Sequence, residues 1–187
     1  MKVLAFGASN SSKSINQKFA TSVSKYYKED EVEILHIHDF EMPIYSADRE
    51  RENGVPQLAY DFASRLDAAD LIIISFAEHN GNYSAGYKNL IDWVSRIKGR
   101  KPYQDAHLFL LSTSFGARGG QSVMEIALAR MPRDGGTVIE HLSLPEFPAN
   151  FEDDKGVTNA LFRSQLEAKV RKTKREMQKI LDSKQTL

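Results

Sequence analysis

A short polar segment near the start of the chain carries side chains that could bind a phosphate group. Residues 7–14 read Gly-Ala-Ser-Asn-Ser-Ser-Lys-Ser, so hydroxyl donors and Lys13 lie close together. Apolar residues then recur at helical spacing, and a helix start presents free N–H groups and a positive dipole end to an anion. The segment has one glycine and matches neither the Walker A nor the G-x-G-x-x-G pattern. We therefore expect a single phosphate monoester as ligand; the alternative is an ordinary polar turn with a serine cap.

A second polar segment, residues 76–84, reads Phe-Ala-Glu-His-Asn-Gly-Asn-Tyr-Ser. Glu78 and His79 suggest acid–base work or a metal pair, but no further ligand lies at a suitable spacing, so we expect no metal site. Asn80-Gly81 is a turn signal, and its N–H groups and amide could bind the edge of a heterocycle. His79 could stack on such a ring, or it is a surface histidine without a role. We expect Glu78 to be a hydrogen-bonding anchor rather than a base.

A third polar segment, residues 112–120, reads Ser-Thr-Ser-Phe-Gly-Ala-Arg-Gly-Gly. Its glycines allow the backbone to approach a ligand closely, and its hydroxyls favour an oxygen-rich partner. Arg118 could meet a phosphate of a second, diffusing ligand, or it is a surface arginine. Trp93, between the second and third segments, is expected in the core or at a subunit interface.

The elements that position these segments follow from hydrophobic periodicity. Unbroken apolar runs are typical of strands buried in a parallel sheet. The sequence predicts strands over residues 2–6, 32–37, 70–76, 107–112 and 137–142. Helical spacing predicts helices over residues 15 to 26 or 27, 57–68, 86–97, 123–131 and 158–181. Ser14 and Gln17 form a Ser-x-x-Gln capping box at the start of the first helix.

The alternation of strands and helices predicts the fold class. We expect an α/β, flavodoxin-like three-layer sandwich with a five-stranded parallel sheet in the order 2-1-3-4-5. The first and third strands are then neighbours, and ligands bind in the crevice at their carboxyl ends. The first two polar segments follow these strands and the third follows the adjacent strand, so all three should line one crevice.

Several stretches are expected outside this alternation or at its edges. Residues 39–56 are expected to form a long loop of functional or interfacial use, and residues 144–157 an irregular stretch. The last helix should turn its apolar residues inward, namely Phe162, Leu166, Val170, Met177 and Leu181. Its outer face is basic and is expected to be solvated, through Arg171, Lys172, Lys174 and Arg175.

Composition and charge exclude several function classes. The chain of 187 residues has 25 basic and 25 acidic side chains, so we expect neither nucleic acid nor a membrane surface as a partner. It has no cysteine, which excludes disulfides, thiolate catalysis and cysteine-ligated metals. It shows no signal-peptide pattern, and no apolar run approaches the ~20 residues of a membrane span. We expect one cytoplasmic domain over residues 1–187.

Together the three segments resemble the NADPH-dependent FMN reductase family, which includes quinone, chromate and azo-dye reductases. The family's G-S-x-R-x-x-S-x-N motif is similar to residues 8–16, Ala-Ser-Asn-Ser-Ser-Lys-Ser-Ile-Asn. Its P-E-Y-N-G motif with a following K-N-x-x-D-W is similar to residues 77–81 and 88–93. Its G-x-R-G-G element is similar to residues 116–120, and the likeness extends from residue 1 to about residue 136.

The resemblance implies that FMN is the bound cofactor, with NADPH or NADH as the diffusible reductant and a small-molecule electron acceptor. The phosphate motif comprises Ser9, Ser11, Ser14, Ile15 and Asn16, of which Ser9, Ser14 and Asn16 would hold the phosphate. The isoalloxazine would lie along Ala77, Glu78, His79, Asn80 and Gly81, flanked by Ser114 and Gly116. The chemistry is borne by the flavin, so no side-chain base is required, and His79 as a proton donor is a secondary hypothesis. The family also implies a homodimer or homotetramer, with residues 39–56 and the helix over residues 86–97 as candidate interfaces.

Three residues depart from the family pattern. Ser11 stands where the family has a phosphate-binding arginine, which removes a charge-assisted hydrogen bond of roughly 1.5–3 kcal/mol unless Lys13 substitutes for it. Ala77 replaces a proline, and His79 replaces a tyrosine beside the ring. These departures keep a rival open: a non-enzymatic flavodoxin-like flavin-binding, electron-transfer or regulatory protein with weakened FMN binding. A further rival, a phosphate-ester or nucleoside enzyme, would have only Glu78 as a catalytic carboxylate.

Overall fold

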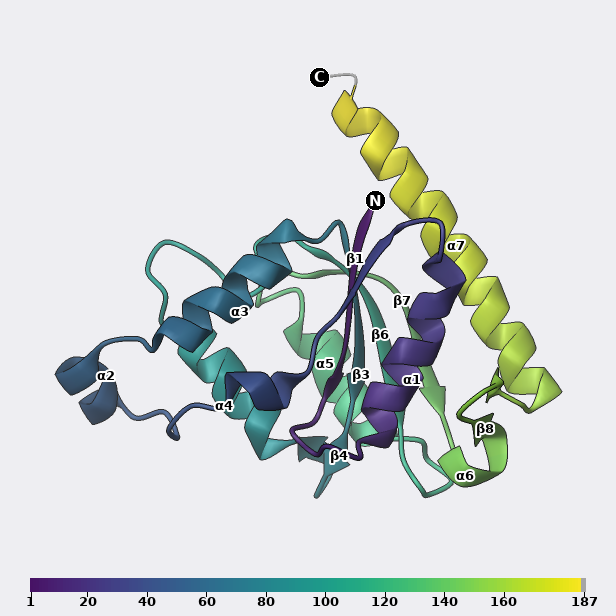
Figure 1. Cartoon of the computed structure of the whole chain (residues 1–187), viewed down its shortest axis with the longest axis horizontal. Coiled ribbons are helices and arrows are strands. Elements are labelled where there is room, and N and C mark those ends of the chain that lie inside the picture. The colour runs from purple at the N-terminus through teal and green to yellow at the C-terminus, as the bar shows by residue number, and fades with distance from the viewer. Residues whose placement is uncertain (186–187) are drawn as a thin grey trace.

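A five-stranded parallel sheet forms the centre of the structure, a computed structural model that describes residues 1–185 (Figure 1). Its strands are β1 (Lys2–Ala8), β2 (Glu31–Ile34), β3 (Leu71–Phe76), β6 (His107–Thr113) and β7 (Thr137–Leu144). They lie in the order β2-β1-β3-β6-β7. This confirms the expected α/β, flavodoxin-like fold with strand order 2-1-3-4-5. The last two residues of the expected domain, 186 and 187, lie outside the described part.

Helices cover both faces of the sheet. They are α1 (Ile15–Ser24), α3 (Gln57–Ala68), α4 (Ala85–Val94), α5 (Gln121–Arg130) and α7 (Ala160–Gln185). The first and last of these pack on one face, around Phe19, Val23, Leu166 and Val170. The other three pack on the opposite face, around Phe62, Leu66, Tyr87 and Val123. Every residue of β3 is buried because this central strand has helices on both sides, which explains its apolar run without alternation.

The register of the sheet brings the carboxyl ends of three strands to one edge. Ala8, the last residue of β1, pairs with Phe76, the last residue of β3, and Phe76 pairs with Ser112 near the end of β6. The three polar segments therefore leave the sheet side by side, as the topology requires.

Residues 39–56 are more regular than the long loop expected from the sequence. The expected strand over 32–37 ends at Ile34, and a 3₁₀ helix follows over Ile37–Phe40. A short helix, α2 (Ala47–Asn53), lies within the stretch and stands away from the body of the protein (Figure 1). Ser46 caps its start by accepting from Arg49 N–H at 3.2 Å, and Gly54 ends it at φ 72°. The prolines and glycine of this stretch thus flank a helix rather than exclude one.

The second polar segment and residues 144–157 also contain local structure. A two-stranded hairpin, β4 (Glu78–His79) and β5 (Asn82–Tyr83), turns at Asn80 and Gly81 with φ of 52° and 74°. Positive φ at both turn positions suits an Asn-Gly hairpin turn. The stretch expected to be irregular holds α6 (Phe147–Asn150) and a second hairpin, β8 (Phe151–Glu152) with β9 (Gly156–Val157).

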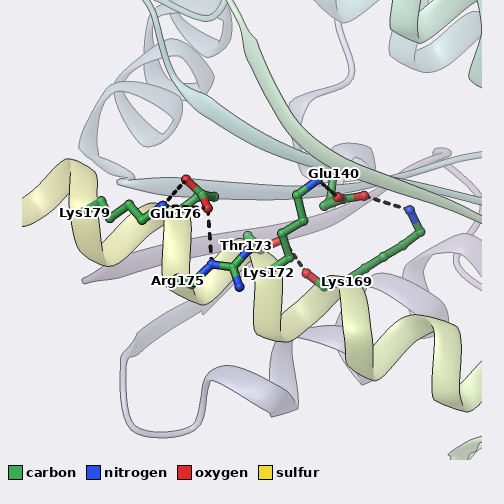
Figure 2. Close-up of polar contacts among 7 residues, drawn as sticks. All are labelled: Glu140, Lys169, Lys172, Thr173, Arg175, Glu176 and Lys179. Carbon is green, nitrogen blue, oxygen red and sulfur yellow. Dashed lines mark hydrogen bonds and ion pairs between the residues drawn. The ribbon is translucent and has the colours of Figure 1, made fainter.

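The last helix corrects two details of the sequence analysis. Ile180, rather than Leu181, packs against the core at the end of α7. Lys172, expected on a solvated basic face, instead binds the carboxylate of Glu140 on β7 at 2.5 Å, and Lys169 binds the same carboxylate at 2.7 Å (Figure 2). This side of α7 is therefore pinned to the edge strand by charge as well as by apolar packing.

Candidate functional site

The turn between β1 and α1 is tightly built around Ser14 and Gln17. Ser14 Oγ accepts from Gln17 N–H at 3.2 Å and so caps α1, as expected. The reciprocal half of the predicted capping box is wrong: Gln17 Oε1 accepts from Gly7 N–H at 2.9 Å, because Ser14 N–H already donates to Ser11 O at 3.1 Å. A Cβ on Gly7 would lie 2.4 Å from Gln17 N, so only glycine allows β1 and α1 to approach this closely.

The same turn leaves a set of hydrogen-bond donors without internal acceptors. The hydroxyl oxygens of Ser9 and Ser11 accept from Ser11 N–H at 3.3 Å and Lys13 N–H at 3.4 Å, which leaves each O–H free to donate. Within residues 1–185, no acceptor meets the backbone N–H of Ile15 or Asn16, the first two residues of α1. Donors at a positive helix end, beside the exposed Lys13, fit a phosphate group.

Asn16 joins this helix start to two strands. Its side chain is buried, with 3% exposed. Its carboxamide oxygen accepts from Ser75 Oγ at 2.7 Å and from Thr113 N–H at 3.1 Å, and its nitrogen donates to Thr113 O at 3.2 Å. The resemblance implies that Asn16 lies at the phosphate; its side chain is engaged inside the protein, and its backbone N–H is the group left without an acceptor among the described residues.

Glu78 anchors the β4–β5 hairpin to the start of α5. Its Oε2 accepts from Val123 N–H at 3.0 Å, and its Oε1 lies 3.8 Å from Arg118 Nη2. Gly120, at the N-cap position of α5, has no side chain to cap the helix, so the Glu78 carboxylate serves this end from the neighbouring segment. This matches the anchoring role expected for Glu78, and it leaves His79 and Asn80 exposed at the turn.

The first and second segments touch through Ser84, which caps α4. Ser84 Oγ donates to Ala8 O at 2.8 Å and accepts from Tyr87 N–H at 3.3 Å. A Cβ on Gly86 would lie 2.9 Å from Asn10 Cγ, so the start of α4 lies directly against the first loop. Ser84 was not among the predicted caps, although a serine directly before a helical pattern is an N-cap signal.

The third segment is held against the end of β7. Ser114 O accepts from Phe147 N–H at 3.0 Å, and Gly116 O accepts from Glu146 N–H at 3.1 Å. A Cβ on Gly119 would lie 2.8 Å from the backbone of Leu144, so this glycine serves packing within the fold rather than approach to a ligand. The tip of the segment, from Phe115 to Arg118, is exposed.

The residues of the Lys-Asn-x-x-Asp-Trp stretch have structural roles in α4. Trp93 is buried in the core and donates from Nε1 to Pro43 O at 2.7 Å. Asn89 Oδ1 accepts from Tyr45 N–H at 2.8 Å, and its Nδ2 donates to Met42 O at 3.0 Å. These two side chains hold the base of the projecting segment that carries α2. Lys88 and Asp92 pair with each other on the helix surface, at 2.6 Å.

The structure thus brings the expected site residues to one edge of the sheet. Ser9 to Asn16 lie at the start of α1, Ala77 to Gly81 lead into and form the adjacent hairpin turn, and Ser114 and Gly116 lie on the loop after β6. The links between them run through residues that the sequence analysis did not single out: Ser75, Ser84, Thr113 and Val123. Among the described residues, no group of three or more acidic or histidine side chains could hold a metal ion. Over the same residues, no helix is both long and apolar enough to cross a membrane.

Comparison with known proteins points to one family. The sequence model of NADPH-dependent FMN reductases matches residues 1–142. A quinone reductase of Escherichia coli K12 is 32% identical over 80 residues, which is 43% of this chain and 42% of that protein. The aligned region thus spans less than half the length of this curated relative.

Solved structures share the fold at low sequence identity. The flavoenzyme NAD(P)H:(acceptor) oxidoreductase FerB from Paracoccus denitrificans superposes with a TM-score of 0.72 at 21% identity, covering 93% of this chain and 97% of FerB. An azoreductase from Bacillus anthracis superposes with a TM-score of 0.57 at 16% identity, covering 91% of this chain and 97% of that one.

Proposed function

The chain belongs to the NADPH-dependent FMN reductase family, and we propose that it is an FMN-dependent oxidoreductase. In this proposal NADPH or NADH is the reductant, and the acceptor is a small organic molecule such as a quinone, an azo compound or free flavin. The names of its relatives, a quinone reductase among them, support this acceptor class. When bound, FMN supplies the electron transfer between the two, and the protein binds, orients and tunes it.

One observation carries the proposal: an anion-binding helix start and two further polar loops meet at the carboxyl edge of the sheet. The unengaged N–H groups of Ile15 and Asn16, with the hydroxyls of Ser9, Ser11 and Ser14, hold the phosphate of the cofactor. Lys13 contributes positive charge to the phosphate site. The family's arginine corresponds to Ser11, two positions earlier in the chain.

The ring end of the cofactor is assigned to the hairpin turn and the loop after β6. His79, Asn80 and Gly81 lie along one side of the ring, and Ser114 and Gly116 flank it. Backbone N–H groups of such turns stabilise negative charge on a nearby electron-rich ring without a proton transfer. Because Glu78 is occupied by Val123 N–H, no side chain of the site is assigned as a base, and His79 is the one exposed titratable group at the turn.

The proposal is tested on purified protein loaded with FMN under anaerobic conditions. Addition of NADPH or NADH should bleach the visible flavin absorbance, and addition of a quinone should restore it. Protein that binds FMN but keeps its colour with both nucleotides would instead be a flavin-binding carrier. Protein that does not bind FMN would favour the regulatory alternative.

The phosphate site has a sharper test at Ile15, the first residue of α1. Proline is tolerated at this position and would remove the N–H that we assign to the phosphate. Ile15→Pro should weaken FMN binding about tenfold, the value of one hydrogen bond to a charged group. Ile15→Ala, which loses the same packing but keeps the N–H, is the matched control and should bind FMN like the parent. Riboflavin, which has no phosphate, should bind both variants equally.

We propose, from the family, that the protein acts as a homodimer or homotetramer, with the α2 segment and α4 at the interface. Sedimentation of the FMN-loaded protein measures this directly.

A further inference from the structure

The sequence contains two Asn-Gly pairs, and they lie in different surroundings. Asn53-Gly54 stands at the end of α2, and Asn80-Gly81 forms the turn of the β4–β5 hairpin. The second pair belongs to the turn that is assigned to the flavin ring, so a covalent change there would alter the site itself. The hydrogen bonds around each pair decide which of them can react.

An asparagine that is followed by glycine can lose its side-chain amide without an enzyme. The backbone nitrogen of the glycine attacks Cγ of the asparagine, the N–Cγ bond forms, and the Cγ–Nδ2 bond breaks as ammonia leaves with the glycine proton. Water then adds to the cyclic imide and opens it to aspartate or isoaspartate. The reaction needs a free carboxamide, an accessible backbone nitrogen and a backbone that can bend, and glycine favours the last two because it has no Cβ.

The Asn80-Gly81 pair has both reacting groups free. The Asn80 side chain is exposed, and within residues 1–185 its carboxamide has no hydrogen-bond partner. The N–H of Gly81 likewise meets no backbone acceptor in that range. Apart from the adjacent residues, the nearest atom to a Cβ built on Gly81 would be Ser122 Cβ, at 3.9 Å, so nothing crowds the turn.

The hairpin can also bend at its tip. Each of its strands has two residues, and an isolated two-stranded hairpin is only marginally stable. The Glu78 carboxylate anchors it away from the tip, through Val123 N–H. Among the described residues, the side chain of Asn80 makes no such contact, so the tip can leave its positive-φ turn and reach the geometry of the cyclic imide.

The Asn53-Gly54 pair is protected by its helix. Asn53 Nδ2 donates to Arg49 O at 3.4 Å, and Gly54 N–H donates to Glu50 O at 2.9 Å. Both reacting groups are thus engaged, and the last turn of α2 must open before they can meet. This pair is therefore an internal reference for the reactivity of the exposed turn.

We propose that Asn80 is a site of spontaneous deamidation, which converts the turn from a neutral to a negatively charged one. The product lacks the Asn80 amide donor and carries a carboxylate beside the assigned ring position; the effect on the flavin rests on the proposed function. A nearby negative charge disfavours added electrons on the ring, so the midpoint potential of bound FMN should become more negative. Isoaspartate also adds its Cβ carbon to the backbone of the turn, which should loosen the hairpin.

The test incubates the protein at mildly alkaline pH, where the glycine N–H loses its proton more readily, and maps the deamidated peptides by mass spectrometry over time. Asn80 should convert first, and Asn53 should convert about tenfold more slowly because its helix end must open. Asn80→Gln has a longer side chain that closes such a ring less readily, and it should keep its carboxamide under the same conditions.

The effect on the flavin is measured with the product itself. Aged parent protein and Asn80→Asp should both bind FMN about threefold to tenfold more weakly than fresh parent, the value of one lost amide hydrogen bond. Asn159→Asp makes the same chemical change at the start of α7 and keeps the oxygen that accepts from Leu161 N–H, so it is the matched control and should bind FMN like the parent.

Asn80 that stays intact, or that converts no faster than Asn53, would overturn the inference. A parallel incubation contains FMN, and a ring that lies along the turn should slow the reaction at Asn80. Conversion of Asn80 at the same rate with FMN, together with unchanged FMN affinity in Asn80→Asp, would support the modification site and contradict the placement of the flavin. The mass measurement without FMN does not depend on the reductase proposal, so the two proposals fail separately.

Discussion

Asn16 on α1 and Thr113 at the end of β6 exchange two hydrogen bonds, although they lie 97 residues apart in the chain. The Asn16 carboxamide thus pairs with the backbone of Thr113 much as a neighbouring strand would. It also accepts from Ser75 Oγ on β3. One buried side chain therefore fixes the start of α1, the proposed phosphate site, relative to the strands that precede the other two loops.

Removal of the Asn16 carboxamide should destabilise the protein strongly. Asn16→Ala leaves the buried N–H and C=O of Thr113 unpaired, so the free energy of unfolding should fall by about 2–4 kcal/mol. Asn16→Asp keeps one acceptor oxygen but places the other against Thr113 O. Its loss of unfolding free energy should be larger at neutral pH, where the carboxylate is charged, than at acid pH. Urea unfolding followed by circular dichroism measures both. Asn10→Ala, at an exposed asparagine with one hydrogen bond to Glu41, is the control, and an equal loss there would contradict the assignment.

Truncation of Glu78 should detach the hairpin from α5. Glu78→Ala removes the acceptor for Val123 N–H at a helix start, a change worth about 1–2 kcal/mol of stability. Glu78→Gln keeps a carboxamide oxygen in place and should lose less than half of that. Hydrogen exchange of the Val123 amide gives the local readout, with Glu52→Ala on the exposed α2 helix as control. Slow exchange at Val123 in Glu78→Ala would show that another group caps α5.

The sequence was sufficient for the sheet and its order because each strand is a short apolar run and each crossover holds one amphipathic helix. β3 illustrates this: burial on both faces leaves an unmistakable run from Leu71 to Phe76. The sequence signals for secondary structure were weaker where charged residues stand next to prolines and glycines. Residues 47–53 form a helix with no buried residue, so no apolar periodicity reveals it, and the cap at Ser46 is the one signal available.

The meeting of the three polar segments at one edge was predictable from the sequence, but the contacts between them were not. Polar segments after neighbouring strands predict a common edge, which the register confirms. The partners of Asn16 and Glu78 lie far away in the chain, and no spacing rule connects residue 16 to Thr113 or residue 78 to Val123. Similarly, Lys172 reads as one of several surface lysines until β7 places Glu140 beside it. Long-range pairing of polar side chains depends on the finished fold.

The ion pairs of Glu140 with Lys169 and Lys172 should make the free energy of unfolding depend on pH in the acid range (Figure 2). Burial raises the pKa of Glu140, but the Lys169 and Lys172 ammonium groups outweigh it and hold this pKa at about 2, below the ordinary 4.5. A lowered folded-state pKa gives stability that is fully present above pH 4.5 and is lost as pH falls toward 2. Glu140→Gln should therefore cost about 2–3 kcal/mol near neutral pH, and the difference from the parent should shrink as pH falls through this window.

Urea unfolding of the parent and Glu140→Gln at several pH values measures this dependence. Glu176→Gln is the control: Glu176 lies on α7, its partners Arg175 and Lys179 are exposed, and the substitution should show a smaller effect. A constant difference between the parent and Glu140→Gln across the acid range would mean that the ion pairs do not control the titration.

Loss of the Asn89 side chain should release the segment that carries α2. Asn89→Ala removes the acceptor for Tyr45 N–H and the donor to Met42 O, while Trp93 still binds Pro43 O. Trypsin should then cut at Arg49 and Arg51 about tenfold faster, because local opening controls cleavage. Gln57→Ala, at an exposed glutamine of α3, is the control. An unchanged cleavage rate would show that the Trp93–Pro43 hydrogen bond and the Arg96–Glu50 ion pair suffice to secure the segment.

Replacement of Ser11 by arginine should strengthen binding of a phosphorylated flavin. Ser11 is exposed beside the unengaged N–H groups of Ile15 and Asn16, so a guanidinium there can reach the same anion. A charge-assisted hydrogen bond of roughly 1.5–3 kcal/mol corresponds to about a tenfold to hundredfold lower dissociation constant for FMN. Riboflavin should bind the parent and Ser11→Arg equally, because it lacks the phosphate. Ser11→Gln, which adds length without charge, is the matched control. If Ser11→Arg raised the affinity for riboflavin as much as for FMN, the arginine would be acting on the ring, and the start of α1 would lose its assignment as the phosphate site.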